Sequence, residues 1–212
     1  MNNLKKQFIE FTLNHEILRF GSFTLNSGRQ SPYFFNSGLC NDGKLLNSLA
    51  EFYTRLINEK NIEYDFIFGP AYKGITLASS ISHVLFKKYS INKPYCFNRK
   101  EVKTHGEAGV FVGIKPEGSS LIVDDVISSG KSISDSIELL KNNNSNPLSV
   151  LVAFDRMEVG QKHRASIELS NEYSVSVHSI ITLDDIIEYL KSNNSLGIHI
   201  FEMEKYISKY KR

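Results

Sequence analysis

The chain has 212 residues, of which 41% are hydrophobic and 23% are charged, as in an ordinary globular protein with one core. Its formal net charge is only +2, which argues against a nucleic-acid-binding protein, because such proteins usually have a larger basic excess. No window reaches about 18 consecutive apolar residues, and the first residues contain no apolar core of signal-peptide length. We therefore expect one domain over residues 1–212 in the cytoplasm, with no nucleic-acid or membrane partner.

Hydrophobic spacing predicts the order of the elements. Apolar residues at helical intervals predict an amphipathic helix over residues 3–19 and another from residue 45 onward, whereas residues 21–43 have the mixed polar and aromatic character of short strands and turns. Further strands are predicted at 65–69, 94–98, 121–125, 148–155 and 175–183, and further helices at 74–88, 132–141, 184–191 and 198–210. The polar, Gly-rich residues 99–118 are interpreted as a loop. Short apolar strands that alternate with helices predict an α/β fold with a parallel sheet.

In such sheets, ligands bind beyond the carboxyl ends of the strands. The loops to inspect are therefore those that follow residues 68, 98, 125 and 155, and all four contain polar side chains.

The segment LIVDDVISSGKS ends in Gly-Lys-Ser after an apolar strand, as a nucleotide-binding P-loop does. The first glycine of such a loop would stand five residues before Gly130, where this chain has Asp125. An aspartate there would place negative charge against the phosphates, which argues against a P-loop nucleotidase.

The residues 128–132 still connect a strand to the start of a helix. The unpaired N–H groups and the dipole of a helix start favour a bound anion, and the serine hydroxyls add donors. The alternative is a plain helix cap formed by Ser132 or Ser134.

Asp124 and Asp125 lie just before this turn. Two adjacent carboxylates at a strand end need donors or a cation, which sugar hydroxyls or Mg²⁺ would supply. A phosphate-binding turn next to two such acids predicts a site for a ribose 5-phosphate.

This motif resembles the 5-phosphoribosyl diphosphate (PRPP) motif of type I phosphoribosyltransferases. Other segments resemble the bacterial orotate phosphoribosyltransferases in the same order along nearly the whole chain: QFIEF, FTLNSGRQSPYFFN, FGPAYKGI, PYCFNRKE, HGE and IITLDDIIEYL. The resemblance implies the type I phosphoribosyltransferase fold, with a mostly parallel central sheet flanked by helices. It also implies a small hood over the base, formed by the N-terminal region, about residues 1–43.

The implied activity is the transfer of the 5-phosphoribosyl group from PRPP to orotate, which gives orotidine 5′-monophosphate and pyrophosphate in pyrimidine biosynthesis. The implied cofactor is Mg²⁺, held mainly through PRPP near Asp124 and Asp125. The resemblance further implies a homodimer with shared active sites, in which Arg99 and Lys103 reach from one chain into the site of the other.

The resemblance also assigns roles to single residues. In the implied mechanism, Asp124 and Asp125 stabilise the ribose, while Lys100, Lys103 and His105 stabilise the departing pyrophosphate. The residues implied in PRPP binding are Asn26, Tyr72, Lys73, Arg99, Lys100, Lys103, His105, Asp124, Asp125, Val126, Ile127, Ser128, Ser129, Gly130, Lys131 and Ser132. Those implied in orotate binding are Phe34, Phe35, Ser128 and Arg156, and a cis peptide bond is implied between Ala71 and Tyr72.

The chain departs from the family pattern at Asn26, where the family usually has lysine, and in the motif loop. The family usually has threonine at 128 and 131 and alanine at 129 and 132, whereas this chain has Ser128, Ser129, Lys131 and Ser132. Ser128 keeps the hydroxyl, and Lys131 adds a cation beside the expected phosphate site. Two further alternatives keep the fold: a phosphoribosyltransferase for another base, against which Phe34, Phe35 and Arg156 argue, and a non-catalytic PRPP-binding regulator, against which the basic residues of segment 98–109 argue.

Overall fold

The computed structural model describes residues 1–25, 28–103 and 109–210. In these residues, six strands form the central sheet in the order β5-β4-β3-β6-β7-β8, and all neighbours are parallel except β4 and β5. The strands are β3 (Phe66–Gly69), β4 (Tyr95–Lys103), β5 (Gly109–Gly113), β6 (Gly118–Ile127), β7 (Ser145–Asp155) and β8 (Ser176–Thr182). The predicted α/β fold with a mostly parallel sheet is confirmed.

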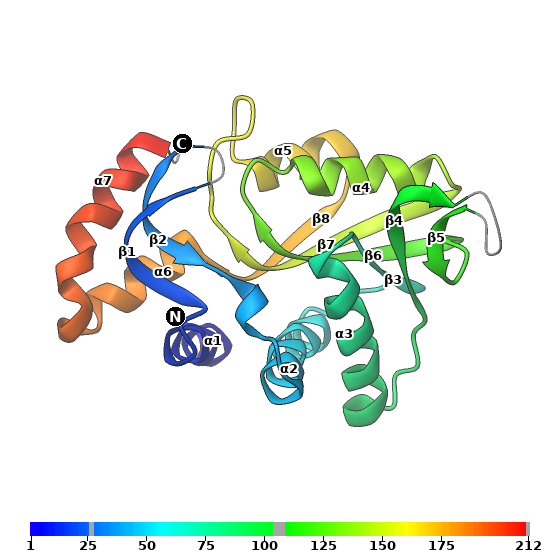
Figure 1. Ribbon diagram of the computed structural model, residues 1–212, viewed down its shortest axis with the longest axis horizontal. Helices are drawn as coiled ribbons and strands as arrows, with labels where there is room; N and C mark the ends of the chain where they lie inside the picture. The colour runs from blue at the N-terminus through cyan, green and yellow to red at the C-terminus, as the bar shows by residue number, and fades with distance from the viewer. Residues whose placement is uncertain (26–27, 104–108, 211–212) are drawn as a thin grey trace.

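Helices cover both faces of this sheet (Figure 1). The helices α1 (Asn3–Asn14), α2 (Gly43–Glu59) and α3 (Lys73–Tyr89) lie on one face, and α4 (Lys131–Lys141) and α5 (Ala165–Tyr173) lie on the other. Alternate residues of β6 enter the two hydrophobic clusters, with Leu121 and Val123 in one and Ile122 in the other. This period of two explains why the strand is apolar along its length, because both faces are buried.

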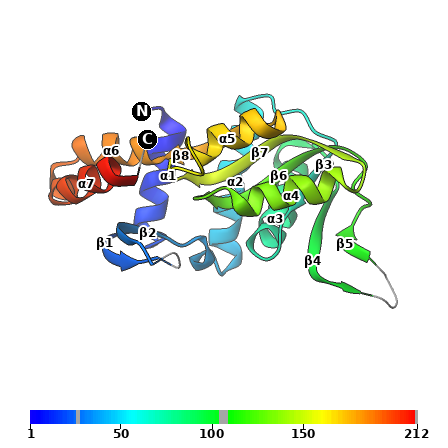
Figure 2. The same cartoon turned by 90° about the horizontal axis from the view of Figure 1, so that it is seen from above.

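A separate two-stranded antiparallel sheet, β1 (Leu18–Thr24) with β2 (Gln30–Phe35), lies beyond one end of the central sheet (Figure 2). A short 3₁₀ helix (Ser37–Leu39) follows it. The C-terminal part, α6 (Leu183–Lys191), a 3₁₀ helix (Asn194–His199) and α7 (Ile200–Tyr210), lies at the same end, and α7 packs against β2. The hairpin and α7 thus form one lobe, although one is near the start of the chain and the other near its end.

The first helix is shorter than predicted, and the prediction of a helix through residue 19 is wrong. The helix α1 ends at Asn14, Glu16 adopts a left-handed conformation with φ of 55°, and Leu18 begins β1. Leu18 is buried, with 1% of its surface exposed. Its position fits a helical repeat by coincidence, because the turn at Glu16 redirects the chain before Leu18 enters the core.

Residues 99–118 are not a simple loop, so that prediction also needs correction. β4 continues to Lys103, and the chain returns as β5, with Phe97 opposite Val112 and Asn98 opposite Phe111. The charged residues in the second half of β4 made this segment resemble a loop rather than a strand. The short helix α5 was not predicted either, because only two of its residues, Ala165 and Leu169, are buried and its apolar pattern is weak.

The helix α6 begins with a capping box. The Thr182 side chain accepts a hydrogen bond from Asp185 N, and the Asp185 carboxylate accepts one from Thr182 N at 2.8 Å. None of the helices in the described ranges is both long and apolar enough to cross a membrane.

Candidate active site

A cavity of about 710 Å³ lies beyond the carboxyl ends of β3, β6 and β7 and beside the β1–β2 hairpin. This is the position in which open α/β sheets bind their ligands. The described residues that line it are Thr24, Leu25, Arg29, Phe34, Phe35, Pro70, Ala71, Tyr72, Lys73, Asp124, Asp125, Val126, Ser128, Ser129, Ser132, Arg156 and Glu158. Most of the residues singled out in the sequence therefore meet around one cavity.

The two acids at the end of β6 make different contacts. The Asp125 carboxylate accepts hydrogen bonds from Lys73 Nζ and Ser37 Oγ, both at 2.6 Å. The Asp124 carboxylate accepts one from Asp125 N at 2.9 Å and one from Ser132 Oγ at 3.3 Å. Only 9% of Asp124 and 8% of Asp125 is exposed. Both carboxylates are thus held at the cavity wall by side-chain donors from three other parts of the chain and by the Asp125 backbone N–H.

Burial, reinforced by the neighbouring Asp125 carboxylate, raises the pKa of Asp124 from its ordinary value to about 6. The charged form of Asp124 is therefore disfavoured until a ligand supplies donors or positive charge. The hydroxyl groups of a ribose would supply such donors, and a positive charge that develops on its ring would supply the charge.

The start of α4 has the geometry of an anion site. Its N-cap is Gly130, whose φ of 79° lies in the left-handed region, and no side chain caps the helix. The alternative of a plain cap by Ser132 or Ser134 is wrong, because Ser132 donates to Asp124 and Ser134 donates to the Lys131 carbonyl. Ile133 N and Ser134 N donate to the Gly130 carbonyl, so the N–H groups that a phosphate would use at this helix start are those of residues 128–132.

The segment between β3 and α3 forms the next wall. The cis peptide bond implied between Ala71 and Tyr72 is present. Ala71 N donates to Asn98 Oδ1 at 2.9 Å, which ties the segment to β4. Lys100 Nζ lies 4.4 Å from the centre of the exposed Tyr72 ring, so one cation of the basic segment 98–109 reaches this wall.

This segment also depends on a close backbone approach. A Cβ on Gly69 would lie 1.9 Å from the Gly74 carbonyl oxygen, so no other residue fits without a shift of the backbone. The sequence GPAYKG thus has glycines where the strand and the following helix touch.

The far wall is formed by aromatic residues and a buried arginine. Phe34 and Phe35 come from β2, Ser128 follows β6, and Arg156 follows β7. Arg156 N donates to the Ile127 carbonyl at 3.1 Å, which joins the ends of the two strands. Only 5% of Arg156 is exposed, so its guanidinium offers a charge with little competing water.

Sequence reasoning missed two residues of this wall, Arg29 and Glu158. Arg29 stands in the quoted segment FTLNSGRQSPYFFN, and Glu158 stands two residues after Arg156. The position of Glu158 so close to Arg156 could have indicated a second charged residue in the site. Its partners Arg29 and Tyr206 are distant in the sequence, so the sequence alone did not indicate them.

Some predicted residues lie elsewhere. Asn26 and His105 fall outside the described residues, as does the side chain of Lys103. Lys131 is exposed and pairs with Asp135 at 3.1 Å, one turn further along α4. The Ile127 side chain is buried in the hydrophobic core, which limits its contribution to PRPP binding to backbone atoms. Arg99 donates to the Gly109 carbonyl at 3.4 Å within its own hairpin.

Comparison with known proteins agrees with this geometry. Residues 41–188 match the model of the phosphoribosyl transferase domain. The orotate phosphoribosyltransferase of Haemophilus influenzae (strain PittGG) is 45% identical over 211 residues, which is 99% of each chain. The chain belongs to the orotate phosphoribosyltransferase family.

Relatives of this family share the whole architecture. The orotate phosphoribosyltransferase of Hahella chejuensis is 45% identical over 99% of this chain and 98% of its own. The crystal structure of the Francisella tularensis orotate phosphoribosyltransferase superposes with a TM-score of 0.86 at 40% identity, over 97% of this chain and all of its own. The hairpin and α7 are therefore part of the family's fold, although they lie outside the stretch matched by the general domain model.

Proposed function

We propose that this protein is an orotate phosphoribosyltransferase, which transfers the 5-phosphoribosyl group of PRPP to orotate in the cytoplasm as a step of pyrimidine biosynthesis. One observation supports this most directly. The acid pair Asp124 and Asp125 lines one cavity together with the start of α4 and the cationic side chains Lys73 and Arg156, and Lys73 contacts Asp125. Such a site suits a sugar with a phosphate at one end and an anionic base at the other.

The reaction exchanges one bond at ribose C1. The bond from C1 to the pyrophosphate oxygen breaks, and its electron pair leaves with pyrophosphate, while a ring nitrogen of orotate forms the new bond to C1 and releases its proton to water. The bond to pyrophosphate breaks ahead of the formation of the bond to orotate, so positive charge develops on the ribose. The carboxylates of Asp124 and Asp125 hold the ribose hydroxyls and stabilise that charge.

The remaining residues bind the two ends of PRPP and the base. The turn 128–132 holds the 5′-phosphate, and Phe34, Phe35, Ser128 and Arg156 hold orotate, which supplies orientation. The departing pyrophosphate meets Tyr72 and Lys73 and the side chains of the basic segment 98–109, namely Arg99, Lys100, Lys103 and His105.

The donor set of the cavity fits Mg²⁺ as the cofactor. Mg²⁺ prefers oxygen ligands, and Asp124 and Asp125 provide carboxylates at the cavity wall. Since the Asp125 carboxylate is paired with Lys73 and no group of three metal-binding side chains occurs in the described residues, PRPP oxygens would hold most of the ion. When bound, Mg²⁺ neutralises the charge of pyrophosphate.

The direct test is to mix the protein with orotate, PRPP and Mg²⁺ and to follow the loss of orotate absorbance. We expect a PRPP-dependent loss with release of pyrophosphate. Absence of any loss, beside an active control enzyme, would contradict the proposal. If another base is consumed faster than orotate at fixed PRPP, the alternative with a different base holds, and PRPP binding without turnover of any base would indicate a regulator.

The same assay tests the cofactor. Excess EDTA should abolish turnover, and added Mg²⁺ should restore it. Full activity in EDTA would refute the dependence on Mg²⁺.

We also propose a homodimer in which Arg99 and Lys103 of one subunit complete the site of the other. Mixing Asp125→Asn subunits with Lys103→Ala subunits, each inactive alone, should then restore activity, because a mixed dimer contains one site with both residues intact. Random mixing gives about a quarter of the wild-type activity. Activity that stays at the level of the separate variants would show that the sites are not shared.

A further inference from the structure

A buried network lies behind the wall formed by Arg156. Arg156 Nε donates to Glu158 Oε1 at 2.7 Å, and its terminal amino group donates to the Tyr206 hydroxyl at 3.0 Å. The Tyr206 hydroxyl donates to the same Glu158 oxygen at 2.5 Å. The other Glu158 oxygen accepts a hydrogen bond from Arg29 at 3.2 Å. These contacts fix the Arg156 guanidinium from two sides.

The network is shielded from water. Arg156, Glu158 and Tyr206 are each exposed by only 4–5%. Hydrogen bonds to charged groups are strong where water is excluded, and removing one partner leaves the others unsatisfied. The guanidinium therefore has one well-defined orientation rather than several.

The charges of the network suit an anionic base. Two guanidinium groups, of Arg29 and Arg156, share one carboxylate, that of Glu158, so the cluster retains one positive charge at the cavity. Without Glu158, two cations would face each other, and without the arginines the carboxylate would repel the substrate.

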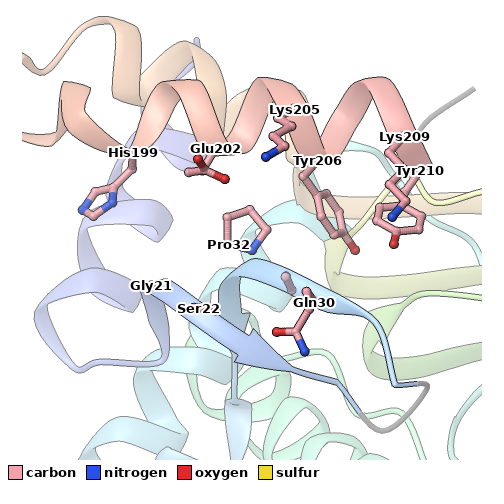
Figure 3. A pocket seen from close by; sticks show the side chains of 11 residues that line it. Gly21, Ser22, Gln30, Pro32, His199, Glu202, Lys205, Tyr206, Lys209 and Tyr210 are labelled. Atoms are coloured by element: carbon pink, nitrogen blue, oxygen red, sulfur yellow. The ribbon is translucent and has the colours of Figure 1, made fainter.

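The C-terminal helix supplies the hydroxyl that closes the network. Figure 3 shows Tyr206 projecting from α7 toward the β1–β2 hairpin, where it lines a second cavity of about 390 Å³. Its ring packs edge-on against Tyr33, with centroids 5.6 Å apart, and the Arg156 guanidinium lies 4.6 Å from the centre of the Tyr33 ring. Tyr206 thus reaches from the second cavity to two residues that line the first.

We propose that Glu158 and Tyr206 are positioning residues that orient Arg156 toward the base, so that α7 determines the affinity for orotate. This inference rests on the proposed function, in which Arg156 binds orotate. Arg29 and Tyr206 lie outside residues 41–188, the part that matches the general phosphoribosyl transferase model, whereas Arg156 and Glu158 lie inside it.

The test variant is Tyr206→Phe, which removes the hydroxyl and keeps the ring packed against Tyr33. We expect the KM for orotate to rise by about fivefold, because the hydroxyl both accepts a hydrogen bond from Arg156 and donates one to Glu158, while the KM for PRPP and kcat change by less than about twofold. The matched control is Tyr173→Phe. Tyr173 lies on α5, away from the cavity, and its hydroxyl donates to Glu138 of α4 at 2.9 Å. The control should leave all three constants unchanged. An unchanged or lower orotate KM in Tyr206→Phe, or an equal rise in both KM values, overturns the inference.

A double-mutant cycle separates this inference from the proposed function. Arg156→Ala should raise the orotate KM, and Tyr206→Phe should then add little, because the residue that it positions is gone. If Arg156→Ala leaves the orotate KM unchanged, the assignment of Arg156 in the proposed function fails. If Arg156→Ala raises it and Tyr206→Phe alone does not, only the positioning role fails. Thermal unfolding of each variant identifies any that is not folded, and the comparison then rests on the remaining variants of the cycle.

Discussion

Replacing Asp125 with asparagine is expected to lower kcat/KM for PRPP by about 10²- to 10³-fold, the range seen when a preorganised electrostatic contact to a transition state is lost. The substitution preserves the size of the side chain and an oxygen that can accept from Lys73 and Ser37. It removes the negative charge that faces the ribose. The loss should therefore appear in turnover rather than in folding.

The control for Asp125→Asn is the same substitution at Asp65. Asp65 lies just before β3, at the amino-terminal end of the strand and so opposite the cavity, where its carboxylate accepts hydrogen bonds from Ser119 N and Oγ. We expect Asp65→Asn to keep kcat/KM within about twofold of the wild type, as for a surface change away from the site. Steady-state kinetics at saturating orotate measures both variants. An Asp125→Asn enzyme with nearly full activity would exclude a role for this charge in the reaction.

The largest effect on stability is expected from Gly69→Ala. The added Cβ would lie 1.9 Å from the Gly74 carbonyl oxygen and 2.8 Å from Ala78 Cβ, so β3 and α3 must move apart. Overpacking of a buried contact usually costs 1–3 kcal/mol, and here the obstacle is backbone, so we expect the free energy of unfolding to fall by about 3 kcal/mol. The Lys73–Asp125 contact would be displaced at the same time.

Gly43→Ala is the matched control, because a Cβ on Gly43 meets no atom within 4 Å. Gly43 is the first residue of α2, so alanine should leave stability unchanged or raise it by up to about 1 kcal/mol. Urea unfolding followed by circular dichroism compares the two variants. If Gly69→Ala unfolds at the same urea concentration as the wild type, the close approach is not a constraint on the fold.

The sequence predicted the central sheet well because its strands are short, apolar and separated by clear helical patterns. The first half of β4 was predicted, but its second half and the edge strand β5 were missed, since Arg99 and Lys100 resemble loop residues and charged side chains are common in strands at the edge of a sheet. The end of α1 was misplaced because Leu18 fits both the helical spacing of α1 and the alternation of β1. The turn at Glu16, with its left-handed conformation, places Leu18 in the strand.

The site was predictable where its residues are local in sequence. Asp124 and Asp125 stand next to the turn 128–132, so one short segment indicates both the sugar and the phosphate. The network of Arg29, Glu158 and Tyr206 could not be read in this way, because its members are unremarkable one by one. Their role depends on which side chains the fold brings together.

The hairpin and α7 meet only through contacts between distant parts of the chain. The Arg29–Glu158 pair spans 129 residues, and the Arg156–Tyr206 contact spans 50, whereas the Ser132–Asp124 contact spans only 8. A contact at long separation requires the chain to close a large loop, and the contacts of Tyr206 also require that α7 has been synthesised. During synthesis, the ribose-phosphate half of the cavity can therefore be ordered while the base half is still open. If Tyr206 orients Arg156 as proposed, the base half of the cavity takes its final form after α7 has docked on the hairpin.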